Sequence, residues 1–424
     1  MAHGIPTTDF TSPSAPVTTV ATGPPAANPA SATTTRRLPK QTKFQLEVAL
    51  LVSTYQRPGH LRRALASIAL QKHVAGKFEV VVTDDGSEDA TSDVVDNFTR
   101  KVDFPVHFTT HLHEQFQLAR CRNEGVRTTT APYLLFLDGD LLLPHDFVAQ
   151  HLKNRSADVT MAGDSCYFTR EDSARVNDDT LRSGQFLDWI PPSEEARLIK
   201  KALRSKLYNL IRHPTKPHLK GGNIGIWRSD YERINGFDEH FVGWGLEDTD
   251  LQWRLARHGI RFRSSMGWTC TCHLWHPPSS TFVHKARGTD NEAYLRRPGR
   301  LSVCRHGLRR RVLSELRIGV VGRAADQAVA DRLLSGRFAA RQPRPEVEIV
   351  FTPGDGRYSR GGRSRLTRSQ RAECRILVVT RLTPNVGRLA RQADIVVSDE
   401  AIHSIPSRPQ FPLDQFDAAL ESIT

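Results

Sequence analysis

From residue 47 onward, short apolar runs alternate with longer amphipathic segments, and this alternation constrains the fold more than any other feature. The runs EVALLVSTY (47–55) and KFEVVVTDD (77–85) have the character of buried strands, and GHLRRALASIALQK (59–72) between them has helical spacing. A helix at 90–101, a strand near Val106, a helix at 115–127 and a strand at 131–140 continue the series. We therefore expect an α/β fold whose mostly parallel sheet is covered by helices on both faces.

A second series of short buried strands begins beyond residue 300. Four runs predict strands, ELRIGVVGR, EVEIVFTP, CRILVVTR and ADIVVSDE, and helices are expected at 324–334 and 386–393. The GVVG stretch lacks the full glycine-rich dinucleotide fingerprint and predicts a structural turn. We expect a small α/β domain of unknown role at 301–424 after a larger domain at 43–300, with a flexible, charged loop or lid from about Ser165 to Lys220.

The first 42 residues are expected to form a disordered tail, because they are rich in Pro, Ser, Thr and Ala and offer no periodic apolar face. The tail lacks the charged start and apolar core of a secretory signal, and no later apolar run approaches the roughly 20 residues that cross a bilayer. Six cysteines are too sparse for a secreted disulfide framework. A cytoplasmic protein without a membrane span is the expectation.

The net charge of +13 constrains the partners of the chain. Such a field can attract nucleic acid, an anionic membrane or small phosphorylated ligands. The basic stretches GLRRR and GRYSRGGRSRLTRSQR lack interleaved aromatics and match no nucleic-acid module, so we expect no nucleic-acid partner. A solvated basic surface remains the simpler interpretation, and a homo-oligomer remains open.

Acidic residues follow two of the predicted strands. Asp84 and Asp85 come after EVVVT, and Asp138 and Asp140 come after LLFL. Because ligands of open α/β sheets bind beyond the carboxyl ends of the strands, these acids are expected to converge on one site. The Asp-Gly-Asp spacing suits a shared Mg²⁺ or Mn²⁺ ion, although Asp and Gly also populate ordinary turns.

A third acidic group follows a Gly-Trp-Gly turn in FVGWGLEDTDLQWRLARHG (241–259). The pattern predicts a helix with Leu251 and Leu255 on its buried face. Acids in a first helical turn stabilise the helix dipole, which accounts for one or two of Glu247, Asp248 and Asp250. A third acid beside a flexible turn that carries an aromatic residue favours a cluster that faces a sugar substrate.

These motifs, taken in order from about Ala49 to Pro277, resemble the family 2 nucleotide-sugar glycosyltransferases, which have the GT-A fold. The second half of this region is similar to the carboxyl-terminal region of galactosyltransferase-like enzymes. The matching stretches are VSTYQRP, VVTDDGSEDAT, RNEG, YLLFLDGDLLLP, GGNIGIWRSDYERINGFDEHFVGWGLEDTDLQWRLARHG and HLWHP.

The resemblance implies a role for each matching position. The positions that would bind the UDP-sugar donor are Thr54, Tyr55, Arg57, Asp85, Arg122, Asn123, Gly222 and Asn223. Asp138 and Asp140 match the metal-binding motif, His276 matches a further metal ligand, and His273 would contribute a second one. Asp248 would be the general base, Glu247 its acceptor-binding neighbour and Trp244 an acceptor contact.

The implied reaction is inverting, metal-dependent transfer of a hexose to a soluble small-molecule acceptor. Overall similarity to the validoxylamine glucosyltransferases of aminocyclitol antibiotic pathways further implies UDP-glucose as donor and an aminocyclitol as acceptor. His111, His113 and Glu114 form an unusual polar group that would contact the acceptor, unless they are ordinary surface or capping residues.

Alternatives stay open at this point. Cys270, Cys272, His273 and His276 could hold a structural zinc ion, but four ligands within seven residues make a tetrahedral site awkward, so core cysteines with one functional histidine are favoured. The chain could also be a non-catalytic nucleotide-sugar or carbohydrate-binding protein, or build a cell-surface polysaccharide. A nucleotidyltransferase would need a glycine-rich basic loop near the first strand, which the sequence does not have there.

Overall fold

The computed structural model describes residues 45–277, 288–321, 327–334, 345–352, 372–380, 382, 386–402 and 408–423. The predicted tail at 1–42 lies outside these residues, as does Gly322 of the predicted GVVG turn. Within the described part of the chain, no helix combines the length and the apolar character needed to cross a bilayer.

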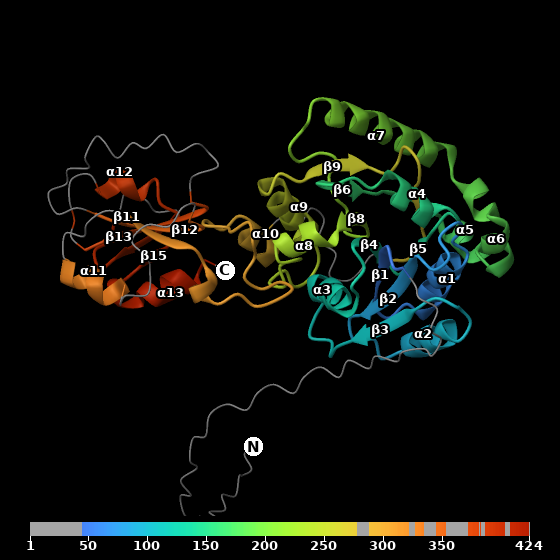
Figure 1. Ribbon diagram of the computed structural model, residues 1–424, viewed down its shortest axis with the longest axis horizontal. Coiled ribbons are helices and arrows are strands. Elements are labelled where there is room, and N and C mark those ends of the chain that lie inside the picture. Colours follow the sequence, from blue (N-terminus) through green and yellow to red (C-terminus); the bar gives the residue numbers. More distant parts are fainter. Residues whose placement is uncertain are drawn as a thin grey trace, which may run out of the picture. The chain divides into compact units, whose positions relative to one another are not determined.

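A seven-stranded sheet forms the centre of the first part of the chain (Figure 1). Its order is β3-β2-β1-β4-β8-β6-β9, and β1, β2, β3 and β4 are mutually parallel. In sequence order the strands are β1 (Val48–Thr54), β2 (Phe78–Asp84), β3 (Val106–Thr110), β4 (Tyr133–Asp138), β6 (Val159–Ala162), β8 (Asn223–Trp227) and β9 (Arg261–Ser264). β8 is antiparallel to β4 and β6.

Helices cover both faces of this sheet, as the alternating pattern predicted. On one face α1 (Pro58–Ala69), α2 (Thr91–Thr99) and α4 (Phe147–Asn154) bury apolar side chains against Val48, Leu50 and Val52. On the other face α3 (Leu118–Thr128), α8 (Arg228–Arg233) and α9 (Glu247–Arg257) pack on Ala49 and Leu51. Successive side chains of β1 therefore pack against opposite helical layers, because strand side chains alternate between the two faces of a sheet. The mostly parallel, helix-flanked sheet expected for a GT-A fold is confirmed.

A smaller sheet lies beside the ends of the central strands. It consists of β5 (Leu141–Leu142), β10 (Thr271–His273) and β7 (Ser165–Tyr167), with β10 in the middle. β10 runs antiparallel to β5 and parallel to β7.

The prediction of a flexible loop at 165–220 is wrong. The segment contains β7, α5 (Arg170–Arg175), α6 (Asp178–Ser183), the 3-10 helix η1 (Gln185–Trp189) and α7 (Pro192–Leu210). Thr169 and Asn177 cap the first two helices through their side chains. Phe168, Leu181 and Phe186 share one apolar cluster with β10. Their irregular spacing in the sequence hid this cluster, which forms only when β7 pairs with a distant strand.

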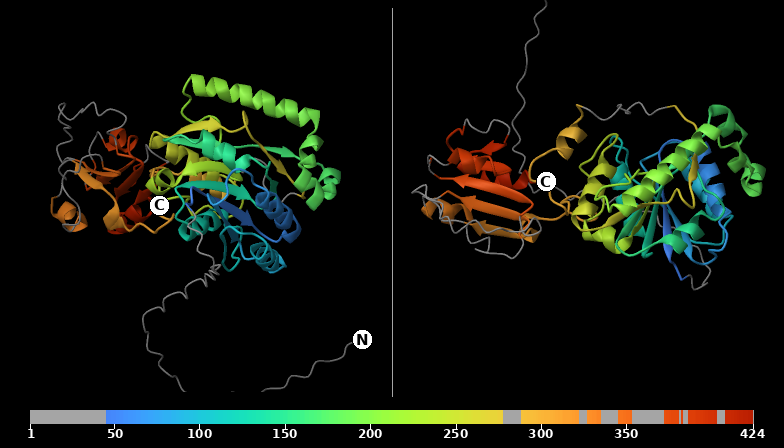
Figure 2. Two further views of the ribbon diagram at one scale, coloured as in Figure 1. Left: turned by 45° about the vertical axis from the view of Figure 1, so that its right-hand side comes forward. Right: turned by 90° about the horizontal axis from the view of Figure 1, so that it is seen from above.

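A second, five-stranded parallel sheet lies in the last quarter of the chain, with the order β11-β12-β13-β14-β15. The four predicted strands are present as β11 (Ile318–Val321), β12 (Val347–Phe351), β13 (Cys374–Val379) and β14 (Ile395–Ser398). Helices α11 (Gln327–Leu334) and α12 (Val386–Ala390) accompany them, together with the unpredicted β15 (Gln410–Phe411) and α13 (Phe416–Glu421). This sheet has its own apolar clusters. Figure 2 shows both sheets from two further directions.

Candidate active site

The small sheet brings Asp140, His273 and His276 together. Asp140 directly precedes β5, and His273 ends β10, which pairs with β5. The Leu274 amide donates a hydrogen bond to the Asp140 carbonyl oxygen at 3.0 Å and extends this pairing. Backbone hydrogen bonds between distant segments therefore set the separation of the three side chains.

These three side chains direct their polar atoms to a common point. His276 Nε2 lies 3.2 Å from Asp140 Oδ2, and His273 Nε2 lies 3.6 Å from Asp140 Oδ1. One ligand atom from each residue lies within 4.8 Å of the others. Asp140 Oδ1 is buried and has no hydrogen-bond partner among the described residues, which a bound cation would correct. Carboxylate oxygen with imidazole nitrogen suits a divalent transition-metal ion such as Mn²⁺. The residues present thus fit a divalent metal.

Asp138, the first carboxylate of the Asp-Gly-Asp motif, is not one of this close group of three. Its side chain is 39% exposed, and its Oδ1 lies 3.3 Å from Arg122 Nη2. Gly222 lies against it, because a Cβ atom on Gly222 would stand 2.0 Å from Asp138 Oδ2. Because residue 222 has no side chain, there is room beside it for the Asp138 carboxylate.

This contact gives a first prediction. Gly222→Ala forces the Asp138 carboxylate to move, and for the transferase reaction that the resemblance implies we expect kcat/KM to fall by up to about 10²-fold, as a displacement of about 1 Å can cause. Gly267→Ala is the matched control, since a Cβ there meets nothing within 4 Å. Equal activity of the two variants in a UDP-release assay would contradict the prediction.

Arg122 connects the metal-binding end of β4 with helix α9. Its Nη1 lies 3.2 Å from Glu247 Oε1, its Nη2 lies 3.3 Å from Asp138 Oδ1, and its guanidinium stands 5.0 Å from the centre of the Phe237 ring. The side chain is only 2% exposed. The structure therefore places Arg122 beneath the site, as a bridge between two acids.

Asn123 is fully buried, and its side chain is hydrogen-bonded to other protein groups. Its Nδ2 donates to the Phe237 carbonyl and to Glu239, and its Oδ1 accepts from Tyr231 and the Phe237 amide. Both polar atoms are thus saturated by protein. The structure does not bring Asn123 to the side chains that surround Asp140.

The three acids of α9 have three different surroundings. Glu247 pairs with Arg122, and burial together with the neighbouring Asp248 raises its pKa to about 7. Asp248 is partly exposed, and its Oδ2 accepts a hydrogen bond from the Gly221 amide at 3.3 Å. Asp250 is buried and forms ion pairs with Arg254 and Arg300, each at 2.6 Å. Asp250 is therefore structural, and Glu247 and Asp248 remain for chemistry.

The turn before α9 uses backbone conformations that favour glycine. Gly243, Gly245 and Leu246 have φ values of 79°, 95° and 77°. Leu246 therefore occupies the left-handed region that few non-glycine residues adopt. Trp244 is partly exposed within this turn. Glu247 and Asp248 begin α9 directly after this turn.

The residues predicted to surround uridine gather where β1 and β2 end. Thr54 ends β1, and the Asp85 amide donates to its carbonyl oxygen at 3.1 Å. The Tyr55 ring stacks on His113, with the ring centres 4.3 Å apart. Arg57 reaches across to Asp140 Oδ2 at 3.3 Å. Thr54, Tyr55, Arg57 and Asp85 thus lie at the edge of the sheet that also carries Asp140.

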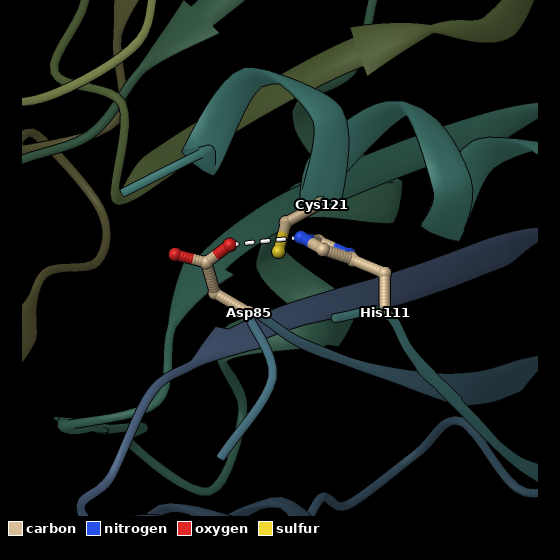
Figure 3. Close-up of side chains that lie close together, drawn as sticks. All are labelled: Asp85, His111 and Cys121. Carbon is tan, nitrogen blue, oxygen red and sulfur yellow. Dashed lines mark hydrogen bonds and ion pairs between the residues drawn. The ribbon is translucent and has the colours of Figure 1, made fainter. Parts of the chain in front are cut away.

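His111 forms a buried network with two carboxylates, Asp85, which Figure 3 shows beside it, and Glu124. His111 Nε2 lies 2.9 Å from Asp85 Oδ1, and Nδ1 lies 3.0 Å from Glu124 Oε2. Burial opposes the charge, but these two bonds raise the pKa of His111 to about 9. With its side chain 1% exposed, His111 is not available for the acceptor contact considered from the sequence.

Cys121 lies close enough to Asp85 and His111 that the three could hold a metal ion. The chemistry opposes this, because both nitrogens of His111 face carboxylates and carry protons at neutral pH. Burial also raises the pKa of the Cys121 thiol well above its usual value. A protonated imidazole and a thiol are not metal ligands, so the group is an ion-pair network.

The network predicts a loss of stability at alkaline pH. An unfolded histidine titrates near pH 6.5, whereas folded His111 titrates at about 9, so the stabilisation is complete below pH 6.5 and is lost as pH rises through about 9. We expect the free energy of unfolding in urea to fall by on the order of 2 kcal/mol across this range. His111→Gln should remove most of this dependence, and exposed His73→Asn should retain it. An unchanged profile in His111→Gln would show that another group causes the loss.

Gly222 and Asn223 lie near the site but differ in their contacts. Gly222 touches Asp138, as described, whereas the Asn223 side chain is buried. Asn223 Nδ2 donates to the Asp164 carbonyl at 3.4 Å and to Thr271 Oγ1 at 3.3 Å. Asn223 therefore ties β8 to the small sheet.

Two residues near the site had no signal in the sequence. The half-exposed Tyr167 ring lies 5.1 Å from the His273 ring, and His60 of α1 lies 6.1 Å from His276 and 3.0 Å from the Trp275 carbonyl oxygen. Tyr167 arrives through the parallel pairing of β7 with β10. Such long-range pairing leaves no local spacing to detect.

The zinc alternative at Cys270, Cys272, His273 and His276 finds no geometric support. Cys272 is fully buried and pairs across the sheet with Leu142 and Cys166. Because side chains alternate along a strand, Cys272 points away from His273. Among the described residues, the only metal-ligand group that includes either histidine pairs them with Asp140.

Residues 49–234 match the model of glycosyl transferase family 2, and residues 204–273 match the N-terminal domain of galactosyltransferase. Validoxylamine A glucosyltransferase of Streptomyces hygroscopicus subsp. jinggangensis is 30% identical over 238 residues, which cover 53% of this chain and 54% of that protein. Hyaluronan synthase of Pasteurella multocida is 26% identical over 264 residues, covering 58% of this chain and 26% of that one.

Among solved structures, the mannosyltransferase PcManGT from Pyrobaculum calidifontis, in complex with GDP-Man and Mn²⁺, is similar. The identity is 20%, the TM-score 0.38, and 62% of each chain is covered. The chain spans about half of the length of the first relative.

Together with the helix-flanked sheet, the Asp–His group and the acids of α9, the match over residues 49–234 indicates a domain similar to glycosyl transferase family 2, as the resemblance implied.

Proposed function

We propose that the chain transfers a hexose, with glucose the first candidate, from a UDP-sugar to a hydroxyl group of a soluble small-molecule acceptor, with inversion at the anomeric carbon. One observation carries the proposal: Arg122 joins Asp138, beside the metal-binding group, to Glu247 at the start of the acid helix. The groups that would receive the leaving diphosphate and the groups that would activate the acceptor thus belong to one connected arrangement.

The proposal assigns the chemistry to a few side chains. Asp248 accepts the proton of the acceptor hydroxyl as general base, and Glu247 and Trp244 bind the acceptor beside it. Thr54, Tyr55, Arg57, Asp85 and Gly222 contact the donor, and Arg122, Asn123 and Asn223 hold the donor site in shape from beneath. Asp140, His273 and His276 would hold a Mg²⁺ or Mn²⁺ ion, with Asp138 nearby, and such an ion supplies positive charge against the departing diphosphate.

The acceptor class rests on similarity. A relative that shares 30% identity is a validoxylamine A glucosyltransferase, and this supports the proposal of an aminocyclitol acceptor in antibiotic biosynthesis. The test incubates the purified chain with UDP-glucose, UDP-galactose or UDP-N-acetylglucosamine, with Mg²⁺, Mn²⁺ or EDTA, and measures UDP release with and without validoxylamine A and related cyclitols. Metal-dependent release from one donor, increased by one acceptor, is the expected result.

Two variants sharpen this test. Asp140→Asn should raise the metal concentration needed for half-maximal release by about 10-fold or more, because it weakens the anionic ligand. Arg182→Gln, at an exposed pair away from the site, should leave that concentration unchanged. UDP binding without release from any donor would instead support the non-catalytic binding protein.

A further inference from the structure

Helix α7 exposes an apolar stripe that nothing in the described chain covers. The stripe consists of Ile199, Leu203, Leu207, Leu210 and Ile211, each more than half exposed. Their spacing of about one helical turn places them on one side of the helix. They are five of the twelve large apolar side chains that are exposed in the described residues, and contiguous apolar surface of this kind marks an interaction site.

The opposite side of α7 attaches the helix to the domain. Leu198 and Ser205 are buried, and Lys201 Nζ lies 2.7 Å from Asp164 Oδ2. Arg197 lies 3.7 Å from the same carboxylate oxygen. The apolar stripe thus faces outward while α7 is held by its inner face, and Figures 1 and 2 show the helix along the outside of the domain.

Apart from the exposed Glu195, one turn before Ile199, the charges around the stripe have one sign. From Ala196 to Ser229 the chain contains no Asp or Glu but nine Lys and Arg residues. Lys200, Arg204, Lys206 and Arg212 are exposed next to the stripe, and none of them has an ion-pair partner within the described part of the chain. The outer face of α7 therefore combines apolar side chains with unpaired positive charge.

We propose that α7 binds the surface of an anionic lipid bilayer. The helix would lie in the plane of the interface, with the apolar stripe at the boundary between headgroups and acyl chains and the four cations among the anionic headgroups. Charge complementarity selects lipid over a second copy of this basic chain, whose α7 would bring like charges together. Bilayer binding by the outer face of α7 does not depend on which donor or acceptor the chain uses.

The experiment measures sedimentation of the full chain with vesicles. One set contains phosphatidylcholine alone, and the other contains phosphatidylcholine with one third phosphatidylglycerol. We expect the chain to sediment with the anionic vesicles and stay in solution with the neutral ones. Leu203→Glu/Leu207→Glu should weaken binding by about tenfold or more, because it places charge in the apolar interface. Lys200→Gln/Lys206→Gln should weaken it as well.

The control is Val312→Glu, which changes another exposed apolar residue away from α7 and should bind as the native chain does. Circular dichroism checks that every variant is folded, and sedimentation does not depend on the proposed transferase activity. Equal binding by Leu203→Glu/Leu207→Glu and Val312→Glu would overturn the proposal. A native dimer that Leu203→Glu/Leu207→Glu dissociates, without vesicle binding, would also overturn it and assign the stripe to a second copy.

Discussion

Asp248→Asn should lower kcat for UDP release to acceptor by about 10² to 10⁴-fold, with a much smaller change in the KM for the donor. The amide retains the size of the side chain and can keep the contact with the Gly221 amide, but it cannot accept the hydroxyl proton. The separation of kcat from KM distinguishes a base from a binding residue.

Glu247→Gln is the matched comparison for this experiment. It makes the same chemical change one residue earlier, at a carboxyl group whose pKa of about 7 reflects burial and the adjacent Asp248. We expect it to raise the KM for the acceptor, with a kcat loss at least about tenfold smaller than that of Asp248→Asn. If Glu247→Gln caused the larger loss of kcat, the base would be Glu247.

Arg122→Met should cost about 3 kcal/mol in the free energy of unfolding, because it leaves the carboxylates of Asp138 and Glu247 without their shared cation. Glu247 is largely buried, so it carries the greater part of the loss, either as an unpaired charge or through the proton uptake that its pKa of about 7 allows. The measurement is equilibrium unfolding in urea, followed by tryptophan fluorescence. We also expect transfer activity to fall, because the two acids lose the bridge between them.

Two controls isolate the effect of the bridge. Arg182→Met removes an ion pair with Asp179 that is exposed on both sides and should change stability by less than about 0.5 kcal/mol. Adding Glu247→Gln to Arg122→Met should restore part of the lost stability, since the buried charge is then absent. A loss no greater than that of Arg182→Met would show that Arg122 does not stabilise the site.

The strands and the acids at their ends could be predicted because their signals are local. A run such as YLLFLDGD carries both the strand and the carboxylates at its carboxyl end within eight residues. The helical period at 247–257 likewise placed Leu251 and Leu255 in the core, where both are fully buried. Parallel pairing then brings such strand ends to one edge of the sheet.

The partners of the acids could not be predicted in the same way. Glu247 and Asp250 are separated by a few residues, yet one pairs with Arg122 and the other with Arg254 and Arg300. Motif position alone treats Arg122 and Asp85 as equivalent donor contacts, but Arg122 bridges Asp138 and Glu247, whereas Asp85 pairs with the buried His111. Which polar residue faces a ligand depends on long-range packing that no local pattern records.

The small sheet of β5, β10 and β7 sets the spacing of Asp140 and His273 without using the helices that follow β7. Asp140 directly precedes β5 and His273 ends β10, which pairs with β5, whereas α5, α6 and α7 lie in the stretch between β7 and β8. That intervening stretch can lengthen, shorten or change its outer face during evolution without altering the spacing of the ligands. The domain is in this sense a fixed reaction centre with an exchangeable insert, and grafting the insert of a relative would change the outer face of α7 while the candidate ligands stay in place.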